Sequence, residues 1–249
     1  MSGHSKWSTI KHKKGALDAK RGKIFTRLIR EITISARTGG GDVEGNPRLR
    51  TAVTAARAAN MPKDNIDKAI KKGTGELAGT VFEEVVYEGY GPSGVAFLVE
   101  VVTDNRMRTT PEIRHMFSKY GGSLGESNSV AWMFEKKGLF VVDRAAVPDE
   151  DKLLEIVLEA GGEDVRDDGD SLEIVTPPET HAHVAAALER AGLTPRASSL
   201  GWLPKNTIRC EAEQARRVLN MFDAFEDHDD VQNVYANFDV DDSILEDRE

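Results

Sequence analysis

The sequence predicts an α+β fold of three domains, in which a helical N-terminal module precedes two α/β domains. Two observations lead to this fold class. Apolar residues recur at three- and four-residue steps until about residue 75, as a helix face requires, and strand-like segments start only after Thr80. From there on strands and helices alternate, and the last predicted helix and strand have no neighbour in sequence with which to form a sheet.

The first predicted helix covers residues 16–38 and has two contrasting faces. Its apolar residues form one stripe, and at ~100° per residue its cations fall on the opposite side. Gly39, Gly40 and Gly41 end the helix. The apolar stripe contains Leu17, Ile24, Phe25, Leu28, Ile29, Ile32 and Ala36. The cationic face, as this set is called below, contains Lys20, Lys23, Arg27, Arg30 and Arg37.

Two shorter helices complete a predicted three-helix bundle. The second starts at Asn46, a cap residue followed by a proline, and runs to about Asn60. The third starts near Pro62 and is expected to end at Gly73, after two lysines in its last turn. The glycine-rich stretch 73–79 is the expected hinge. The shared core is predicted to contain Ile24, Leu28, Leu49, Val53, Ile66 and Ile70.

The rest of the chain is predicted to form two α/β domains. Strands at 81–87 and 95–103, followed by a helix that opens at Thr110, start the first of them. Within 131–205 the order of elements is βαββαβ, which is typical of a ferredoxin-like sandwich. A final helix and strand would complete the first α/β domain, so that the second is inserted into it. The predicted domains are 1–78, 79–130 with 206–240, 131–205, and an acidic tail at 241–249.

The charge of the chain is divided very unevenly along its length. Residues 1–75 contain 17 Lys and Arg against 6 Asp and Glu, a net charge of +11, although the whole chain has a net charge of −9. Residues 76–249 therefore carry −20. A cationic block attracts the phosphates of nucleic acid, whereas the acidic remainder repels them. We therefore expect nucleic-acid contact to be confined to the N-terminal module.

The residues predicted to contact nucleic acid lie in an N-terminal arm and on the bundle. Residues 2–15 have few apolar anchors and are interpreted as an extended arm. Trp7 fits two interpretations equally well, stacking on an unpaired base or anchoring the arm on the bundle. The predicted contact residues are Lys6, Trp7, Lys11, His12, Lys13, Lys14, Lys20, Arg21, Lys23, Arg27, Arg30, Arg48, Arg50, Lys71 and Lys72.

The bundle is poor in side chains that read bases. A recognition helix needs Asn, Gln, Arg or Ser near its start, and only Asn60, Lys63 and Asn65 are placed to serve. The abundance of lysine favours contact with the backbone over sequence reading. Charge reversal at Arg27 and Arg30 is therefore expected to weaken binding to all sequences alike.

A second cationic motif, Asp104-Asn105-Arg106-Met107-Arg108-Thr109, falls between a strand and a helix. Arg106 and Arg108 could contact phosphate. The structural interpretation, in which Thr109 or Thr110 caps the helix and Asp104 pairs locally, is favoured.

Catalysis, metal binding and cofactors are not expected. The chain has no His-Glu-x-x-His and no paired cysteines, and His181 and His183 are two apart, the wrong spacing for one helix face. The glycines at 39–45 follow a helix and lack Gly-Lys-Ser/Thr, so they are no phosphate-binding loop. Asp227, Asp229 and Asp230 could attract Mg²⁺, but ordinary acidic surface is the expected explanation.

The expected location is the cytoplasm. No apolar run approaches the roughly 20 residues of a membrane helix, and the N-terminus lacks a secretory signal. A single cysteine, Cys210, fits a reducing compartment. Residues 223–249 contain 11 acidic residues and one arginine. They are interpreted mainly as a solubility feature, with a flexible tail or contact with a basic protein as alternatives.

Taken in order, several short motifs resemble the YebC family over the whole chain. The opening Gly3-His4-Ser5-Lys6-Trp7 and the run Thr103-Asp104-Asn105-Arg106 are two of them. Others lie at 10–14, 21–23, 28–32, 46–50, 59–62, 70–73, 87–90, 108–109 and 121–125. The resemblance implies a helical domain followed by two α/β domains, the second inserted into the first.

The resemblance also implies a role in gene expression. Bacterial relatives have been described as DNA-binding regulators of transcription, others as ribosome-associated factors that aid synthesis of proline-rich stretches, and a mitochondrial relative as a translational activator. We therefore expect a regulator that is not an enzyme, a monomer or weak homodimer that does not bind membranes. Its target is duplex DNA, with ribosomal RNA on the ribosome as the alternative.

Overall fold

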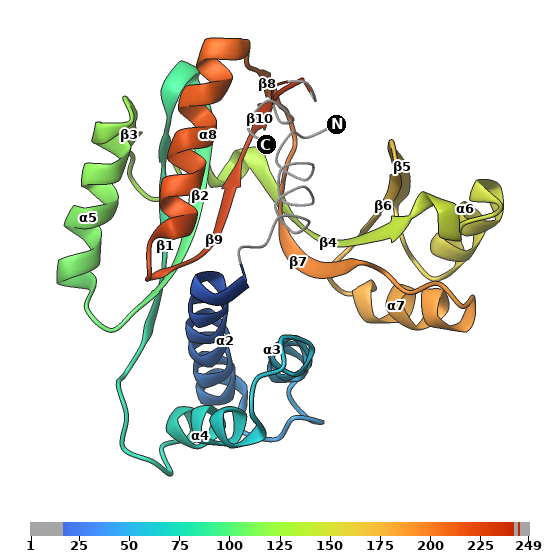
Figure 1. Ribbon diagram of the computed structural model, residues 1–249, viewed down its shortest axis with the longest axis horizontal. Coiled ribbons are helices and arrows are strands. Elements are labelled where there is room, and N and C mark those ends of the chain that lie inside the picture. The colour runs from blue at the N-terminus through green and yellow to red at the C-terminus, as the bar shows by residue number, and fades with distance from the viewer. Residues whose placement is uncertain (1–16, 242–243, 245–249) are drawn as a thin grey trace.

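A computed structural model describes residues 17–241 and Ile244 of the chain. It contains a helical lobe and two α/β lobes, as Figure 1 shows, which confirms the predicted α+β class. The ranges predicted for the domains stay predictions.

The helical lobe consists of α2 (Leu17–Gly39), α3 (Pro47–Ala58) and α4 (Lys63–Thr74). Asn46 caps α3 as predicted, because its side chain accepts a hydrogen bond from the backbone N–H of Leu49 at 3.1 Å. Of the predicted core, Leu49, Val53 and Ile66 are buried, and Leu28 and Ile70 pack against them. Ile24 was predicted wrongly: it is 47% exposed and takes no part in the apolar cluster of the bundle.

Gly73 does not end α4, contrary to the prediction. The helix continues to Thr74, and Gly75 follows it in the left-handed conformation with φ +83°. Gly73 instead permits close packing of two helices, because a Cβ atom there would lie 2.3 Å from the carbonyl oxygen of Thr33 in α2.

The first sheet has the strand order β3-β1-β2-β9. Its strands are β1 (Glu83–Tyr90), β2 (Ala96–Thr103), β3 (Ser123–Leu124) and β9 (Val231–Ala236). Helices α5 (Arg106–Lys119) and α8 (Ala212–Asp227) cover one face, with Phe97, Phe117 and Phe225 packed between the layers. Strand β9 pairs antiparallel with β2, so chain segments on both sides of residues 134–204 build one sheet.

The second sheet has the order β5-β6-β4-β7 and is antiparallel throughout. Its elements follow the chain as βαββαβ: β4 (Phe134–Asp143), α6 (Glu150–Glu159), β5 (Asp164–Asp168), β6 (Ser171–Thr176), α7 (His181–Arg190) and β7 (Ala197–Pro204). The predicted order of elements is therefore confirmed. The two helices pack on a core built around Phe140, Leu172 and Ile174.

The short elements were not predicted. Strand β8 (Ile208–Arg209) pairs with β10 (Phe238–Asp239) in a small parallel ladder. Three 3₁₀ turns, η1 (Pro92–Gly94), η2 (Ala131–Met133) and η3 (Arg144–Ala146), connect larger elements. Segments of two or three residues carry too little periodicity to be recognised in a sequence.

Candidate nucleic-acid interface

The predicted contact residues divide into those that the structure describes and those that it does not. Lys6, Trp7, Lys11, His12, Lys13 and Lys14 lie outside the described residues, as does the arm to which they belong. Lys20 and Arg21 lie in the first turn of α2, and the structure does not describe their side chains. The predictions for all of these residues stay predictions.

Three described residues of the cationic face, Lys23, Arg27 and Arg30, lie against the end of α8 and the residues after it. Arg37 does not: it is exposed and donates to the carbonyl oxygen of Phe82 at 3.1 Å. The ammonium group of Lys23 donates to the carbonyl oxygen of Asp227 at 3.0 Å and pairs with its carboxylate at 3.1 Å. The guanidinium of Arg27 donates to the carbonyl oxygen of Glu226. The last carbonyls of a helix have no partner within it and form the negative end of its dipole. Two cations of α2 therefore cap α8 from another lobe.

Arg30 continues this contact beyond the helix end. Its guanidinium donates to the carbonyl oxygens of Asp229 and Val102, the latter at 3.2 Å, and pairs with the carboxylate of Asp230 at 3.0 Å. The side chains of Arg30 and Asp230 are only 13% and 3% exposed. Their ion pair is shielded from water, whereas the Lys23–Asp227 pair is open to it.

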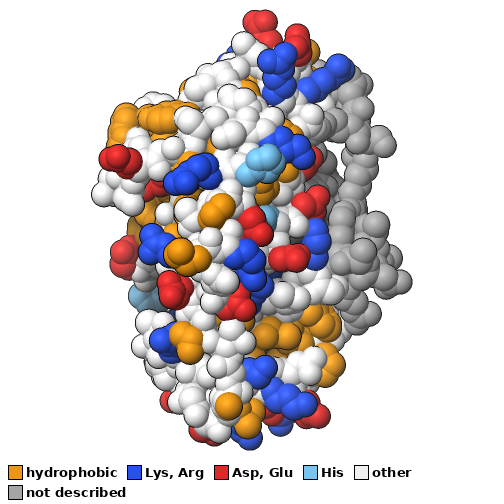
Figure 2. Space-filling view, turned by 90° about the vertical axis from the view of Figure 1, so that its left-hand side faces the viewer, with side chains coloured by type: hydrophobic (Ala, Val, Ile, Leu, Met, Phe, Trp, Pro, Cys, Tyr) orange, Lys and Arg blue, Asp and Glu red, His pale blue; other side chains and the backbone are white. Residues whose placement is uncertain are grey.

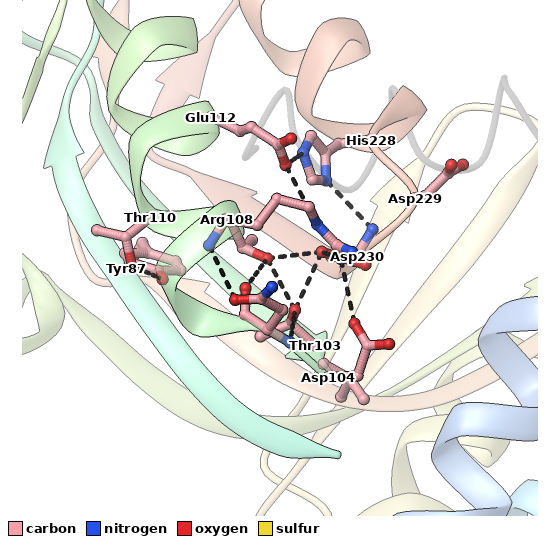
Figure 3. Close-up of polar contacts among 12 residues, drawn as sticks. Tyr87, Thr103, Asp104, Arg108, Thr110, Glu112, His228, Asp229 and Asp230 are labelled. Atoms are coloured by element: carbon pink, nitrogen blue, oxygen red, sulfur yellow. Dashed lines mark hydrogen bonds and ion pairs between the residues drawn. The ribbon is translucent and has the colours of Figure 1, made fainter. Parts of the chain in front are cut away.

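Asp230 has polar partners on three elements, α2, β2 and α5. Figure 3 shows its contacts with Thr103 and Arg108. Besides Arg30 it accepts hydrogen bonds from Thr109 at 2.6 Å, Thr103 at 3.1 Å and Arg108 at 2.6 Å. Burial raises the pKa of the Asp230 carboxyl, but the hydrogen bonds from Thr109 and Arg108 and the charge of Arg30 outweigh it and hold that pKa below its ordinary value. A carboxylate with four donors is a structural junction, so ordinary acidic surface was the wrong expectation for Asp230.

The cationic motif at 104–109 supplies two of the hydrogen-bond donors to Asp230. Asn105, not Thr109 or Thr110, caps α5, because its side chain accepts from the N–H of Arg108 at 3.1 Å. Helix α5 therefore starts four residues earlier than predicted. Arg108 also pairs with Asp104 at 3.3 Å, the local pairing that was expected, and its hydrogen bond to Asp230 raises the pKa of its guanidinium. The favoured structural interpretation holds for Arg108.

The two predicted arginines of α3 also have partners within the bundle and its neighbour. Arg48 joins Glu31 of α2, at 2.7 Å, to Glu84 of β1, and the hydrogen bond to Glu84 raises the pKa of its guanidinium. Arg50 donates to the carbonyl oxygens of Val43 and Glu44. Arg48 therefore links the bundle to the first α/β lobe, and Arg50 stabilises the loop before α3.

Several exposed cations of the bundle lie on α3 and α4. Lys71 and Lys72 are exposed in the last turn of α4 and have no ion-pair partner within the described part of the chain. Cationic side chains show at the lower end of the molecule in Figure 2, next to acidic ones. Lys63, considered above as a base reader, is also exposed, as are Arg57 and Lys68, which sequence reasoning did not select.

The acidic partner of the cationic face was missed. Residues 226–230, called the acidic loop below, comprise the last two residues of α8 and the three that follow it, and lie about 200 residues from α2 in the chain. Residues 223–249 were interpreted mainly as a solubility feature, although a final helix and strand were also predicted within 206–240. In the structure residues 223–240 form the end of α8, the turn after it, β9 and β10. Contact with a basic protein was one of the alternatives for this stretch. In the structure, the basic partner of the acidic loop is the protein's own bundle.

The acidic residues, cysteine and histidines of the described part form no metal-binding cluster. No group of three or more His, Cys, Asp or Glu among them is placed to hold a metal ion. His181 stacks on Phe140 with ring centroids 4.2 Å apart, and burial lowers the pKa of its imidazole. Within the same described part, no helix is both long and apolar enough to span a bilayer.

Comparison with known proteins identifies the family. Residues 5–76 match a family model described as the TACO1/YebC protein N-terminal domain, and residues 82–238 match one described as the TACO1/YebC second and third domain. The chain belongs to the TACO1/YebC family. The predicted resemblance is confirmed.

Its relatives in the TACO1/YebC family carry a regulatory name. A protein of Syntrophus aciditrophicus named "Probable transcriptional regulatory protein" is 58% identical over 99% of this chain and 98% of its own. One of the same name from Acidobacterium capsulatum is 59% identical over 96% of this chain and 97% of its own. The crystal structure of a conserved hypothetical protein from Aquifex aeolicus matches 93% of this chain and 96% of its own, with a TM-score of 0.83 at 48% identity.

Proposed function

We propose that this protein is a non-enzymatic, cytoplasmic regulator of gene expression that binds duplex DNA through its cationic N-terminal module and acts on transcription. The observation that carries the proposal is the confinement of a net charge of +11 to residues 1–75 of a chain whose net charge is −9. Each lysine or arginine placed on a phosphate releases a condensed counterion, which favours binding without regard to sequence. The names of the relatives add support for regulation of transcription.

The exposed cations of α4 are the described residues best suited to contact phosphate. Lys71 and Lys72 have no carboxylate partner in the described part of the chain, so phosphate contact breaks no ion pair found there. Lysine ammonium groups act as point charges rather than as base readers. The proposed interface therefore binds the nucleic-acid backbone, with little sequence preference from the bundle itself.

Crosslinking by ultraviolet light in cells tests this function. The tagged protein is crosslinked, and the bound nucleic acid is identified by nuclease sensitivity and sequencing. DNA from discrete promoters is the expected result, and Lys71→Glu/Lys72→Glu is expected to reduce its yield. Crosslinks to ribosomal RNA instead of DNA would contradict action on transcription and support a translation factor.

A further inference from the structure

The contact between the bundle and the first α/β lobe is mainly polar, with the ring of Phe82, which lies under the guanidinium of Arg30, as an exception. The buried apolar cluster of the bundle, around Ile32, Leu49 and Val53, contains no residue of the α/β lobes. The cluster between the first sheet, α5 and α8 contains no residue of the bundle. The described part of the linker that joins them is glycine-containing and exposed at 75–81. Lobes joined by ion pairs, without a shared apolar core, move relative to each other readily.

The acidic loop presents to the cationic face the kind of atoms that a nucleic-acid backbone presents. Lys23 contacts one carbonyl and one carboxylate oxygen, 3.0 and 3.1 Å away. Arg27 contacts a carbonyl oxygen at the negative end of α8. Arg30 contacts two carbonyl oxygens and a carboxylate. Arginine and lysine bind phosphate through the same charge-assisted hydrogen bonds to oxygen.

We propose that the acidic loop occupies a phosphate-binding surface on α2, so that nucleic acid binds this surface only when the loop leaves it. This inference rests on the proposed function, because it supposes that the N-terminal module binds nucleic acid. The exposed cations of α4 make the first contact, and phosphates then compete with the acidic loop for Lys23, Arg27 and Arg30. Binding thereby separates the bundle from the first α/β lobe.

Burial increases along the cationic face from Lys23 to Arg30. This increase sets the order in which the contacts with the acidic loop break. Lys23 and Asp227 have side chains 44% and 76% exposed, so water and salt weaken their attraction. The Arg30–Asp230 pair is buried and is held by three further donors to Asp230. Lys23 is therefore the first cation to exchange the acidic loop for phosphate.

A zero-length carbodiimide crosslinker reports this exchange in the unmodified full-length chain. The reagent joins an ammonium group to a carboxylate that touches it, and mass spectrometry measures the yield of the Lys23–Asp227 crosslink. The pair Lys137–Glu163, at 2.7 Å on the second α/β lobe, serves as the internal control. The probes are a 30-base-pair mixed-sequence duplex DNA and a 30-nucleotide RNA hairpin, each labelled with fluorescein so that anisotropy measures binding at 50 mM salt.

At saturation with a bound probe, we expect the Lys23–Asp227 yield to fall at least threefold while the Lys137–Glu163 yield stays unchanged. An unchanged Lys23–Asp227 yield with a probe that binds overturns the inference and leaves the proposed function intact. Failure of both probes to bind overturns the proposed function, and the inference with it.

A variant of the acidic loop gives a second measurement. Asp227→Asn removes the carboxylate that holds Lys23 and leaves every predicted contact residue in place. We expect it to tighten probe binding about two- to fivefold, in line with the strength of an exposed ion pair. The matched control is Glu213→Gln, which removes one exposed carboxylate from the other end of α8. Equal affinity gains in the two variants would show a general charge effect. That result would overturn the proposed competition between phosphate and the acidic loop.

Discussion

Helices α2 and α4 both present cations on the same small bundle, yet the structure places these cations in different surroundings. Lys23, Arg27 and Arg30 of α2 contact oxygens at the end of α8 and in the acidic loop. Lys71 and Lys72 of α4 face solvent. The difference shows that a cationic helix face can be covered by the carboxyl end of another helix, because that end presents partly negative oxygens, as a phosphate also does.

The largest effect is expected from loss of the buried carboxylate on which the α2 contact converges. Asp230→Ala leaves Arg30 without its shielded partner and Thr103 and Thr109 without their acceptor. We expect a loss of about 3 kcal/mol in the free energy of unfolding, measured by urea denaturation. The control is Asp229→Ala, which keeps the backbone carbonyl that Arg30 contacts and removes only an exposed side chain. Equal losses in the two variants would contradict the special position of Asp230.

Charge reversal on α4 is expected to act on binding rather than on stability. Lys71→Glu/Lys72→Glu should weaken binding of the duplex DNA probe at least tenfold and flatten its salt dependence by about two counterions, as measured by anisotropy. The midpoint of urea denaturation should hardly change, because the two lysines have no ion-pair partner in the described part of the chain. The matched control is Lys152→Glu/Lys205→Glu, the same charge change on the acidic lobes. Comparable weakening there would show that total charge alone governs binding.

Lowering the pH is expected to weaken the contact between α2 and Asp230 over a definite pH range. The pKa of Asp230 is depressed in the folded protein, so its contribution to stability is fully present above the unfolded value of about 3.9. That contribution is lost as the pH falls through the folded pKa. Denaturation followed from pH 6 to pH 2 should therefore show a decline below about pH 4 that is smaller in Asp230→Asn. A decline of the same size in that variant would assign the acid sensitivity to other carboxylates.

The smallest effect is expected at the exposed end of the cationic face. Lys23→Met keeps most of the aliphatic chain and removes the ion pair with Asp227, whose side chain is 76% exposed. We expect a loss below about 1 kcal/mol in the free energy of unfolding. A loss as large as that of Asp230→Ala would contradict the gradient of burial along the cationic face.

Periodicity was sufficient to locate most helices and strands. Asn46 capped α3 as its sequence context predicted, and the βαββαβ order of the second sheet was recovered. Local signals failed where a distant partner decided the outcome. Asn105 rather than Thr109 caps α5, and Thr109 lies inside the helix, where its hydroxyl contacts Asp230, more than 120 residues away in the chain.

The sequence by itself determined the fold class, the family and the separation of charge between the first 75 residues and the rest. Only the tertiary structure decided which cations of the bundle face solvent. Helical periodicity reports which residues share a face, but what covers that face depends on contacts such as that between Lys23 and Asp227, which are 204 positions apart. Folding brings the free carbonyls of α8 to α2, and this proximity has no signature in the local sequence of either helix.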